Sequence, residues 1–368
     1  MNSHDVRVKL VAIALMCAIV LVLAAAAASA AKVEIHGFML NRVYYQPGAT
    51  HFEAERISLQ ASAPITDEIS ALVEWYYHQW APTDKLWLES AYVDFRDKSD
   101  GRLRVGKGRS YVFGITPTGG MRKMSEYGLV SEAFTQDRIF GMQYNQTLKN
   151  GVAWGAGVYN GYNLGSRPVS DPHAFQHVAN LHLCDRENTT KDVLELGARV
   201  TKKVIPELDL GLSIRGGKLS PTDVSFLQRN FNATWTSRTK MRYGLDAIYR
   251  GKNGLVSNGE VYLAKTSSLQ HLAYALLVGY EPKNPSAMKG YVRWGVSGLD
   301  LNVVDVDASQ VTNQLTFDNE QLMFSLIQPI RPGVWVEFAY LLNDQDPLVS
   351  GVSVPDNDVG FVELFTAF

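Results

Sequence analysis

The stretch RLRVGKGRSYVFGITPTGGMRKMSEYGLVSEAF, residues 102–134, begins as a strand and continues as a long loop that is unusually apolar. Leu103 and Val105 alternate with Arg102 and Arg104, which is the period-two pattern of a strand with two different faces. A loop as long as residues 110–137 is uncommon in a compact domain and usually has a function. We expect this loop to pack against the protein because its apolar residues are Tyr111, Phe113, Ile115, Met121, Met124, Tyr127, Leu129, Val130 and Phe134.

The first 31 residues match a secretory signal peptide. Arg7 and Lys9 give it a basic start, and a run of apolar and then small residues follows up to Ala31. A membrane helix is the alternative, because residues 10–31 are just long enough to span a bilayer. A lipoprotein signal is disfavoured, since the apolar run continues past Cys17. We therefore predict export, with residues 32–368 forming one mature domain.

Composition excludes several classes of protein. The chain of 368 residues is 46% hydrophobic and 20% charged, which argues against disorder. Removing residues 1–31 leaves 33 basic against 36 acidic residues, whereas a nucleic-acid partner would call for a basic chain. Cys184 is the single cysteine beyond residue 31, so an internal disulfide is impossible and stability must come from another source.

The pattern that dominates residues 32–368 is an alternation of period two, as in LDLGLSIR at residues 208–215. Segments of this length can cross a bilayer as tilted strands. About sixteen are expected: residues 33–45, 53–63, 69–77, 86–95, 102–109, 138–146, 152–160, 194–201, 208–215, 241–250, 256–265, 271–280, 291–299, 321–328, 334–343 and 358–368.

The connections between these strands alternate in length. Every second one is short and rich in turn residues, namely 64–67, 98–101, 149–151, 203–206, 252–254, 281–288 and 329–333. Two of them contain Asn-Gly, a strong hairpin signal. Several of the others are long: 110–137, 161–191, 216–239, 300–320 and 344–357. Short turns at one end and long loops at the other are typical of an outer-membrane barrel.

The two faces of the strands also differ in chemistry. One face carries mainly Leu, Val, Ile, Ala, Phe and Tyr, which suits lipid, and the other carries Arg, Glu, Asp, Ser, Gly and Tyr, which suits a water-filled lumen. Only a closed barrel lets such strands satisfy their backbone in hydrocarbon. Aromatic residues near strand ends fit interfacial girdles: Tyr44, Tyr45, Trp75, Tyr77, Tyr249, Tyr280 and Trp294. The predicted fold is an all-β transmembrane antiparallel barrel of about 16 strands.

Short motifs carry a resemblance to a known family. They are ERISLQ at 55–60, AYVDF at 91–95, LRVGK at 103–107, RIFGMQ at 138–143 and GVYNG at 157–161, together with the C-terminal VELFTAF at 362–368. With these motifs the chain resembles the bacterial porins, and more narrowly the phosphate-selective porin O/P family.

The resemblance implies a barrel of sixteen strands, usually a homotrimer, that lets small hydrophilic solutes or anions such as phosphate diffuse across the bacterial outer membrane. It also implies that the third external loop, here residues 110–137, folds into the lumen and narrows it. The implied partners are the lipid bilayer, lipopolysaccharide and the outer-membrane barrel assembly machinery, which recognises the C-terminal signal ending in Phe368. No cofactor is implied.

Candidate residues for the constriction come from the basic strand, the loop and the inward faces of other strands. A basic rim would concentrate anions. An alternative is a transverse field between a positive wall and acidic residues of the loop. The predicted constriction residues are Arg104, Arg109, Arg122, Lys123, Glu126, Glu132, Arg56, Arg215 and Arg242.

Other functions find less support in the sequence. A metal site is conceivable in the fourth external loop, where Asp171, His173, His177, His182, Cys184 and Asp185 cluster, although their spacing matches no tight ligand motif. No catalytic motif is present, and nothing converges on His36, His51 or His78, so an enzyme is not expected. A structural or adhesin barrel with a plugged lumen is the remaining alternative to a channel.

Overall fold

The computed structural model describes residues 32–46, 49–77, 86–115, 123–135, 138–162, 187–188, 193–231, 237–267, 269–300, 318–346 and 358–368. The proposed signal peptide, Arg122 and the cluster of possible metal ligands at residues 171–185 lie outside these ranges. Among the described residues, no helix has the length and apolar character needed to cross a membrane.

The described chain is almost entirely β-structure. Its strands are β1 (Glu34–Gln46), β2 (Ala49–Pro64), β3 (Ile69–Tyr77), β4 (Leu86–Arg96), β5 (Arg102–Arg109), β6 (Arg138–Thr147), β7 (Val152–Tyr162), β8 (Glu187–Asn188), β9 (Leu194–Ile205), β10 (Leu208–Lys218), β11 (Thr239–Arg250), β12 (Leu255–Thr266), β13 (Leu269–Tyr280), β14 (Lys289–Asp300), β15 (Asp318–Arg331), β16 (Val334–Asp346) and β17 (Val359–Ala367). Two helices are described, α2 (Leu129–Phe134) and α4 (Pro221–Phe231).

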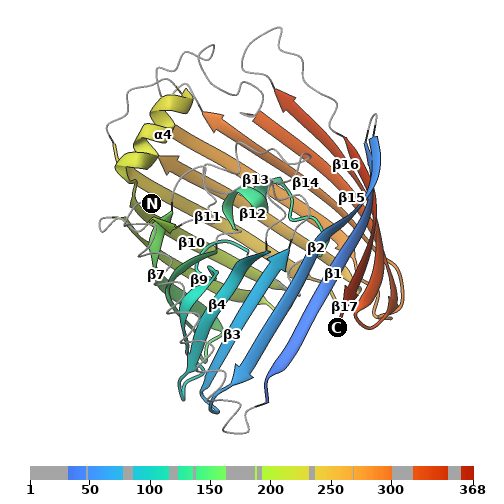
Figure 1. The fold of residues 1–368 in the computed structure, drawn as a ribbon, viewed down its shortest axis with the longest axis horizontal. Coiled ribbons are helices and arrows are strands. Elements are labelled where there is room, and N and C mark those ends of the chain that lie inside the picture. Colours follow the sequence, from blue (N-terminus) through green and yellow to red (C-terminus); the bar gives the residue numbers. More distant parts are fainter. Residues whose placement is uncertain are drawn as a thin grey trace.

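Sixteen of these strands close into one antiparallel barrel (Figure 1). The barrel closes where β1 pairs with β17, from Phe38 opposite Ala367 to Tyr45 opposite Gly360. β8 is a two-residue strand that pairs only with the end of β7, and β9 continues the wall beside β7. The prediction of a closed barrel of sixteen strands is confirmed. We call the end with the short connections the turn end and the opposite end the loop end.

The alternation in sequence becomes an alternation of environment in the wall. On β10, Leu212 is 64% exposed on the outside, whereas Arg215 is 1% exposed on the inside. Leu196 on β9 and Leu245 on β11 are exposed in the same way, so neighbouring strands form a continuous apolar outer surface. Every backbone group in a closed barrel pairs with a neighbouring strand, which is what a bilayer-spanning wall requires.

The inner face is more apolar in places than the prediction of a polar, water-filled lumen implies. Met323, Ile327, Leu341 and Phe361 point inward and form a buried apolar cluster on the strands from β12 to β17 and on β1. Tyr44 belongs to this cluster, so its assignment to an outer aromatic girdle is wrong. Residues two positions apart on a strand lie on the same face, so Tyr44 points inward together with Arg42.

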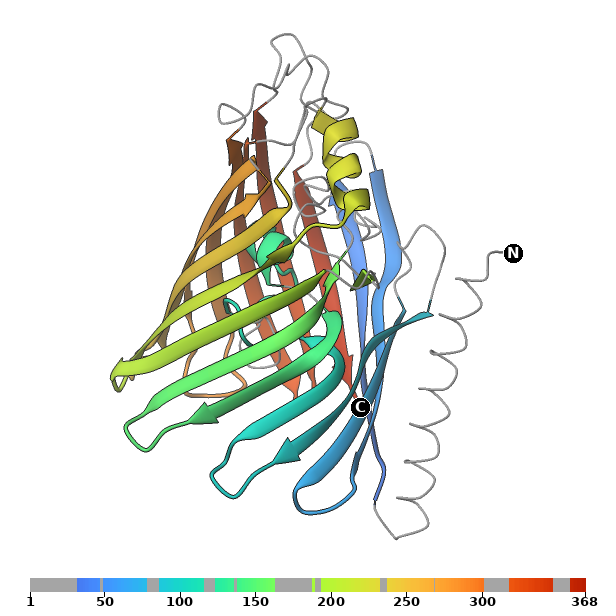
Figure 2. The same ribbon diagram turned by 90° about the vertical axis from the view of Figure 1, so that its left-hand side faces the viewer.

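Two local boundaries also differ from the sequence-based expectation. The turn expected at residues 203–206 lies instead at residues 206–207, because β9 continues to Ile205 and β10 begins at Leu208. The loop between β10 and β11 contains the helix α4, which lies at the loop end of the barrel (Figure 1). In Figure 2, by contrast, the short helix α2 lies inside the barrel, and it contacts β13 and β14.

Candidate channel constriction

The third external loop, residues 110–137, is named L3 here, and its described parts, residues 110–115 and 123–135, lie in the interior of the barrel. It leaves β5, and its backbone is held by side chains of strands on another part of the wall. The Gly114 amide donates to Ser213 Oγ of β10 over 3.2 Å, and the Ile115 amide donates to Tyr262 Oη of β12 over 3.1 Å. L3 is therefore folded into the lumen, as predicted.

The first anchor of L3 is apolar. Phe113 and Phe134 both pack on Tyr262, with ring centroids 5.4 and 5.2 Å away and the Phe134 ring stacked. Val130 and Ala133 of α2 complete this buried cluster against Ala264 of β12 and Ala273 of β13. The prediction that the apolar residues of L3 pin it against the inner wall is confirmed.

Close approach to the wall is possible at two points because L3 has glycine there. Gly114 (φ 63°) and Gly128 (φ 81°) both adopt left-handed backbone conformations. A Cβ at Gly114 would lie 2.6 Å from Cγ2 of Thr135 and closer still to the Tyr262 hydroxyl. A Cβ at Gly128 would lie 2.7 Å from Nη2 of Arg293 on β14. A side chain at Gly114 would push L3 away from Tyr262, and one at Gly128 would displace the Arg293 guanidinium.

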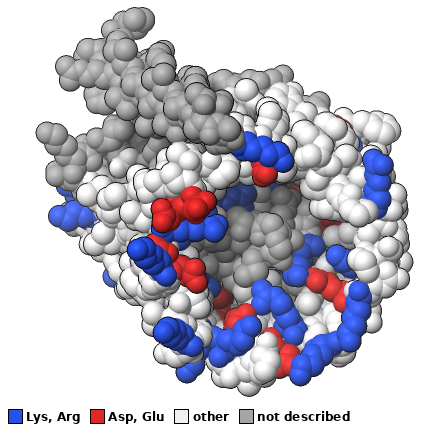
Figure 3. Space-filling model, turned by 90° about the horizontal axis from the view of Figure 1, so that it is seen from below, with Lys and Arg blue, Asp and Glu red and all other residues white. Residues whose placement is uncertain are grey.

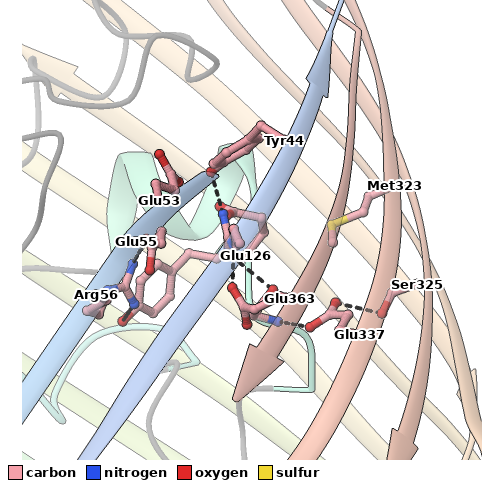
Figure 4. Close-up of polar contacts among 12 residues, drawn as sticks. Tyr44, Glu53, Glu55, Arg56, Glu126, Met323, Ser325, Glu337 and Glu363 are labelled. Atoms are coloured by element: carbon pink, nitrogen blue, oxygen red, sulfur yellow. Dashed lines mark hydrogen bonds and ion pairs between the residues drawn. The ribbon is translucent and has the colours of Figure 1, made fainter. Parts of the chain in front are cut away.

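The second anchor is polar and is centred on Arg42 of β1. Figure 4 shows its acidic partners Glu126 and Glu363. The Arg42 guanidinium forms ion pairs with Glu126 of L3 and with Glu363 of β17. It also donates to Tyr44 Oη over 2.5 Å and to Ser125 Oγ of L3 over 3.2 Å. Because this cation is fully buried, its charge is balanced by carboxylates from two different segments rather than by water.

A neighbouring carboxylate extends this anchor across β16. Glu337 accepts from the Ser125 amide of L3 over 2.9 Å and from Ser325 Oγ of β15 over 2.7 Å. Glu337 is fully buried, and its two oxygens bind L3 on one side and the barrel wall on the other. L3 is thus fixed at Ser125 by two charged residues of the wall. Arg42 binds the Ser125 side chain, and Glu337 binds the Ser125 backbone amide.

The charge of Glu126 depends on this environment. Burial acts to raise the pKa of its carboxyl, and the nearby charge of Arg42, assisted by Arg56, more than offsets burial, so the pKa lies below its usual value. Glu126 is consequently an anion at neutral pH and is committed to holding L3, rather than facing the solute as a free acid.

Arg56 and Arg109, both predicted constriction residues, meet at one tyrosine of L3. Arg56 donates to Tyr127 Oη over 3.0 Å, and Arg109 donates to the same atom over 2.8 Å. Arg56 also forms an ion pair with Glu55 at 2.8 Å, while Arg109 lies 3.7 Å from a carboxylate oxygen of Glu89. The phenol oxygen therefore joins β2, β5 and L3.

Arg104 and Lys123 are placed differently from these two. Arg104 donates from Nε and Nη2 to the two oxygens of Asp94 over 2.8 and 3.0 Å, and its guanidinium lies 3.4 Å from the ring centroid of Tyr92. Lys123, at the start of the described second half of L3, forms an ion pair of 2.6 Å with Glu281. Both cations are thus paired with carboxylates of the wall.

Arg215 and Arg242 lie on β10 and β11, in a cluster with Lys240 around Glu195 of β9. Glu195 is 2.7 Å from Arg215 Nε, 2.5 Å from Lys240 Nζ and 3.8 Å from Arg242 Nη2. Arg242 also donates to the Phe134 carbonyl of L3 over 3.2 Å. Arg242 therefore contributes to docking L3, whereas Arg215 belongs to the wall.

Two groups of charged residues in the lumen each contain both signs of charge but differ in which sign predominates. Around the Arg42 anchor lie five carboxylates and two guanidiniums, all buried except the partly exposed Glu126: Glu53, Glu55, Glu126, Glu337 and Glu363 with Arg42 and Arg56. The wall formed by β9 to β11 has four cations and two carboxylates: Arg199, Arg215, Lys240 and Arg242 with Glu195 and Asp246. Seen from below, Lys and Arg side chains alternate with Asp and Glu side chains around the opening of the barrel (Figure 3).

Sequence reasoning missed Arg42, the residue at the centre of the second anchor. Its signal was the alternation of Leu40, Arg42 and Tyr44 on one face of the first strand. Of the other predicted residues, Arg122 and the side chain of Glu132 lie outside the described part of the structure.

Comparison with known proteins gives a clear result for the fold alone. No family model matches the sequence, and neither does any curated protein. The OmpF structure of Salmonella typhi in complex with daunomycin is similar with a TM-score of 0.64, at 12% identity over 92% of this chain and 98% of that one. The outer membrane channel DcaP of Acinetobacter baumannii is similar with a TM-score of 0.62, at 12% identity over 92% of this chain and 97% of that one. The anion-selective porin from Comamonas acidovorans is similar with a TM-score of 0.54, at 12% identity over 92% of this chain and 100% of that one.

This chain has the fold of bacterial outer-membrane channels.

The histidines considered for catalysis are not brought together by this porin-like fold. His36 is near the turn end of β1 and lies 3.6 Å from Glu34, whereas His51 is near the loop end of β2 and stacks on Tyr44. His78 lies outside the described ranges. Within those ranges, no three His, Cys, Asp or Glu side chains are arranged to hold a metal ion.

Proposed function

We propose that the chain is an outer-membrane channel for passive diffusion of small hydrophilic solutes or ions, without enzymatic activity. The observation that carries this proposal is the inward-folded L3, which is docked to the wall at two anchors inside a barrel with an apolar exterior and a charged interior. A loop fixed in this way narrows a lumen and leaves solute-accessible space beside it.

The different balance of charge in the two groups favours a transverse field over a uniformly basic filter. Arg104, Arg199 and Lys123 each have a carboxylate partner within 3 Å, so they do not form a ladder of unbalanced cations. A field across a narrow pore orients dipolar solutes and slows apolar ones, since they cannot replace ordered water. Phosphate is one small anion that such a channel would pass, without a dedicated phosphate site being required.

Conductance across a planar lipid bilayer tests the proposal. Purified protein added to the bilayer in 1 M-scale KCl should produce stepwise ion currents, and a salt gradient should give a reversal potential that reports the preference for anions or cations. Absence of any current from folded protein would refute the channel and would favour a structural barrel. Cross-linking in detergent would test the homotrimer, which we propose on the basis of the resemblance to porins.

A further inference from the structure

A cavity of about 420 Å³ lies beside L3, and its two walls differ in chemistry. The volume falls in the range of small-molecule sites, roughly 300–1,000 Å³. One wall comes from the turn-end halves of β15, β16, β17 and β1 and is apolar. The other comes from β3, β4 and β5 and is mainly polar, and Lys123, Ser125 and Tyr127 of L3 also line the cavity.

The apolar wall is a row of aromatic rings on three neighbouring strands. Trp335 of β16 stacks on Phe365 of β17 with centroids 3.5 Å apart and planes 11° apart. Phe365 in turn stacks on Phe38 of β1 at 5.5 Å and 22°. Trp335 and Phe365 are direct partners in the β16–β17 register, and Phe38 joins them across the β1–β17 pairing that closes the barrel. We call these three rings the aromatic row.

The aromatic row lines the cavity although the lumen of a channel is filled with water. All three rings retain partial exposure, unlike Leu40 beside them, which is buried. Apolar surface kept in contact with water is unfavourable, and where it is contiguous it commonly marks a place that another molecule covers. Parallel rings present a surface that a flat solute can extend by one further stacked ring.

Three cations line the same cavity, and each is paired with a carboxylate outside the lining: Arg104 with Asp94, Arg109 with Glu89 and Lys123 with Glu281. Glu74 is the one lining carboxylate among the described residues. A guanidinium carries five N–H donors. Arg104 uses one on Nε and one on Nη2 to bind Asp94, so three of its N–H groups do not bind Asp94. Guanidinium groups pair with carboxylates through short, strong hydrogen bonds.

We propose that this cavity binds small organic anions that contain a flat ring, with the ring on the aromatic row and the carboxylate toward Arg104 and Lys123. The inference rests on the proposed channel function, because the cavity is reached through the lumen. The two walls together select for both properties: a small anion without a ring gains nothing from the aromatic row, and a neutral ring gains nothing from the cations.

Binding of 2-naphthoate to the purified full chain in detergent tests this site, with acetate as the anion without a ring. Equilibrium dialysis should show saturable binding of 2-naphthoate and none of acetate over the same concentration range. Phe365→Leu should weaken naphthoate binding about three- to tenfold, since it keeps the apolar volume and removes the stacked ring. Phe338→Leu is the matched control on β16, because Phe338 faces outward and is 51% exposed.

Circular dichroism establishes that each variant is folded. If Phe365→Leu does not fold, Phe38→Leu removes the neighbouring ring of the aromatic row and carries the same expectation. A second pair examines the charge: Arg104→Gln should weaken binding, and Arg199→Gln, on the β9 wall and paired with Asp246, should leave it unchanged. Equal binding by the Phe365 and Phe338 variants, or equal binding of naphthoate and acetate, would overturn the proposal.

Current through the same protein separates this inference from the channel itself. In a bilayer, 2-naphthoate should reduce the open-channel current of the wild type at concentrations where acetate does not. Protein that conducts but shows no saturable naphthoate binding would overturn the binding site and leave the channel intact. Protein that binds naphthoate in the expected order of variants but never conducts would support the site and overturn the channel.

Discussion

Arg42 of β1 forms an ion pair with Glu126, a residue of the loop between β5 and β6. The same guanidinium binds Glu363 of β17, 321 positions away in the chain. One side chain therefore connects the seam that closes the barrel to the loop that narrows it. Closing the barrel and docking L3 are coupled through a single buried charge.

Replacing this cation should destabilise the protein strongly. Arg42→Met leaves Glu126 and Glu363 buried without their shared cation, and loss of one partner from a buried ion pair costs about 3–5 kcal/mol. Unfolding by urea in detergent micelles measures the loss. Arg250→Gln is the control, because Arg250 pairs with Asp209 at the exposed turn end and its side chain is 45% exposed, so about 1 kcal/mol or less is expected. Equal losses for the two variants would contradict the central role of Arg42.

The docking of L3 should depend on pH through Glu126. Its folded-state pKa is below the usual value, so the stabilisation is complete above the unfolded pKa of about 4.3 and is lost as the pH falls through the folded pKa. The free energy of unfolding of wild type minus that of Glu126→Gln should therefore be constant between pH 7 and about pH 5 and should shrink at lower pH. Comparing the two proteins isolates Glu126 from Glu55 and Glu363, which remain in both. A difference that stays constant down to pH 3 would contradict the ion pair.

The barrel could be predicted from sequence because its cause is local. Period-two alternation and the alternation of short and long connections can both be read from residues close together in the sequence. The strands lie where these patterns predicted them, and the barrel closes by the pairing of β1 with β17. The position of L3 followed from counting strands. The helix α4 could also have been found, because Ser220 and Asp223 bind each other's amides in a capping box ahead of an apolar turn.

The partners of the charged residues could not be predicted, because they depend on how the wall closes. The sequence shows that Arg42 faces inward, but not that Glu126, in a loop from another part of the wall, would reach it. The apolar part of the lumen could not be predicted for a different reason. On β15 the inward residues Met323 and Ile327 alternate with the outward Phe324 and Leu326, so both faces are apolar and the pattern does not tell them apart.

The close contact of L3 with β12 should be sensitive to a single methyl group. Gly114→Ala places a Cβ against Tyr262 and Thr135 and forces a non-glycine residue to adopt φ 63°, which should cost about 1–3 kcal/mol. Thermal unfolding should show the loss, and the open-channel current should become noisier as L3 shifts. Gly259→Ala on β12 is the matched control, since a Cβ there meets no atom within 4 Å. That substitution should leave stability unchanged or raise it by up to about 1 kcal/mol.

Lys123 should influence ion selectivity more than cations on the outer surface do. It borders the spaces on both sides of L3, and its ammonium is held toward the lumen by Glu281 at 2.6 Å. Lys123→Gln removes one positive charge there and should lower the permeability ratio of anions to cations by roughly twofold, because a charge in a narrow low-dielectric pore acts on every passing ion. The reversal potential in a KCl gradient measures the ratio. Lys265→Gln on β12 removes an exposed lysine and should not change it; an equal shift for both variants would show that the ions respond to net charge rather than to Lys123.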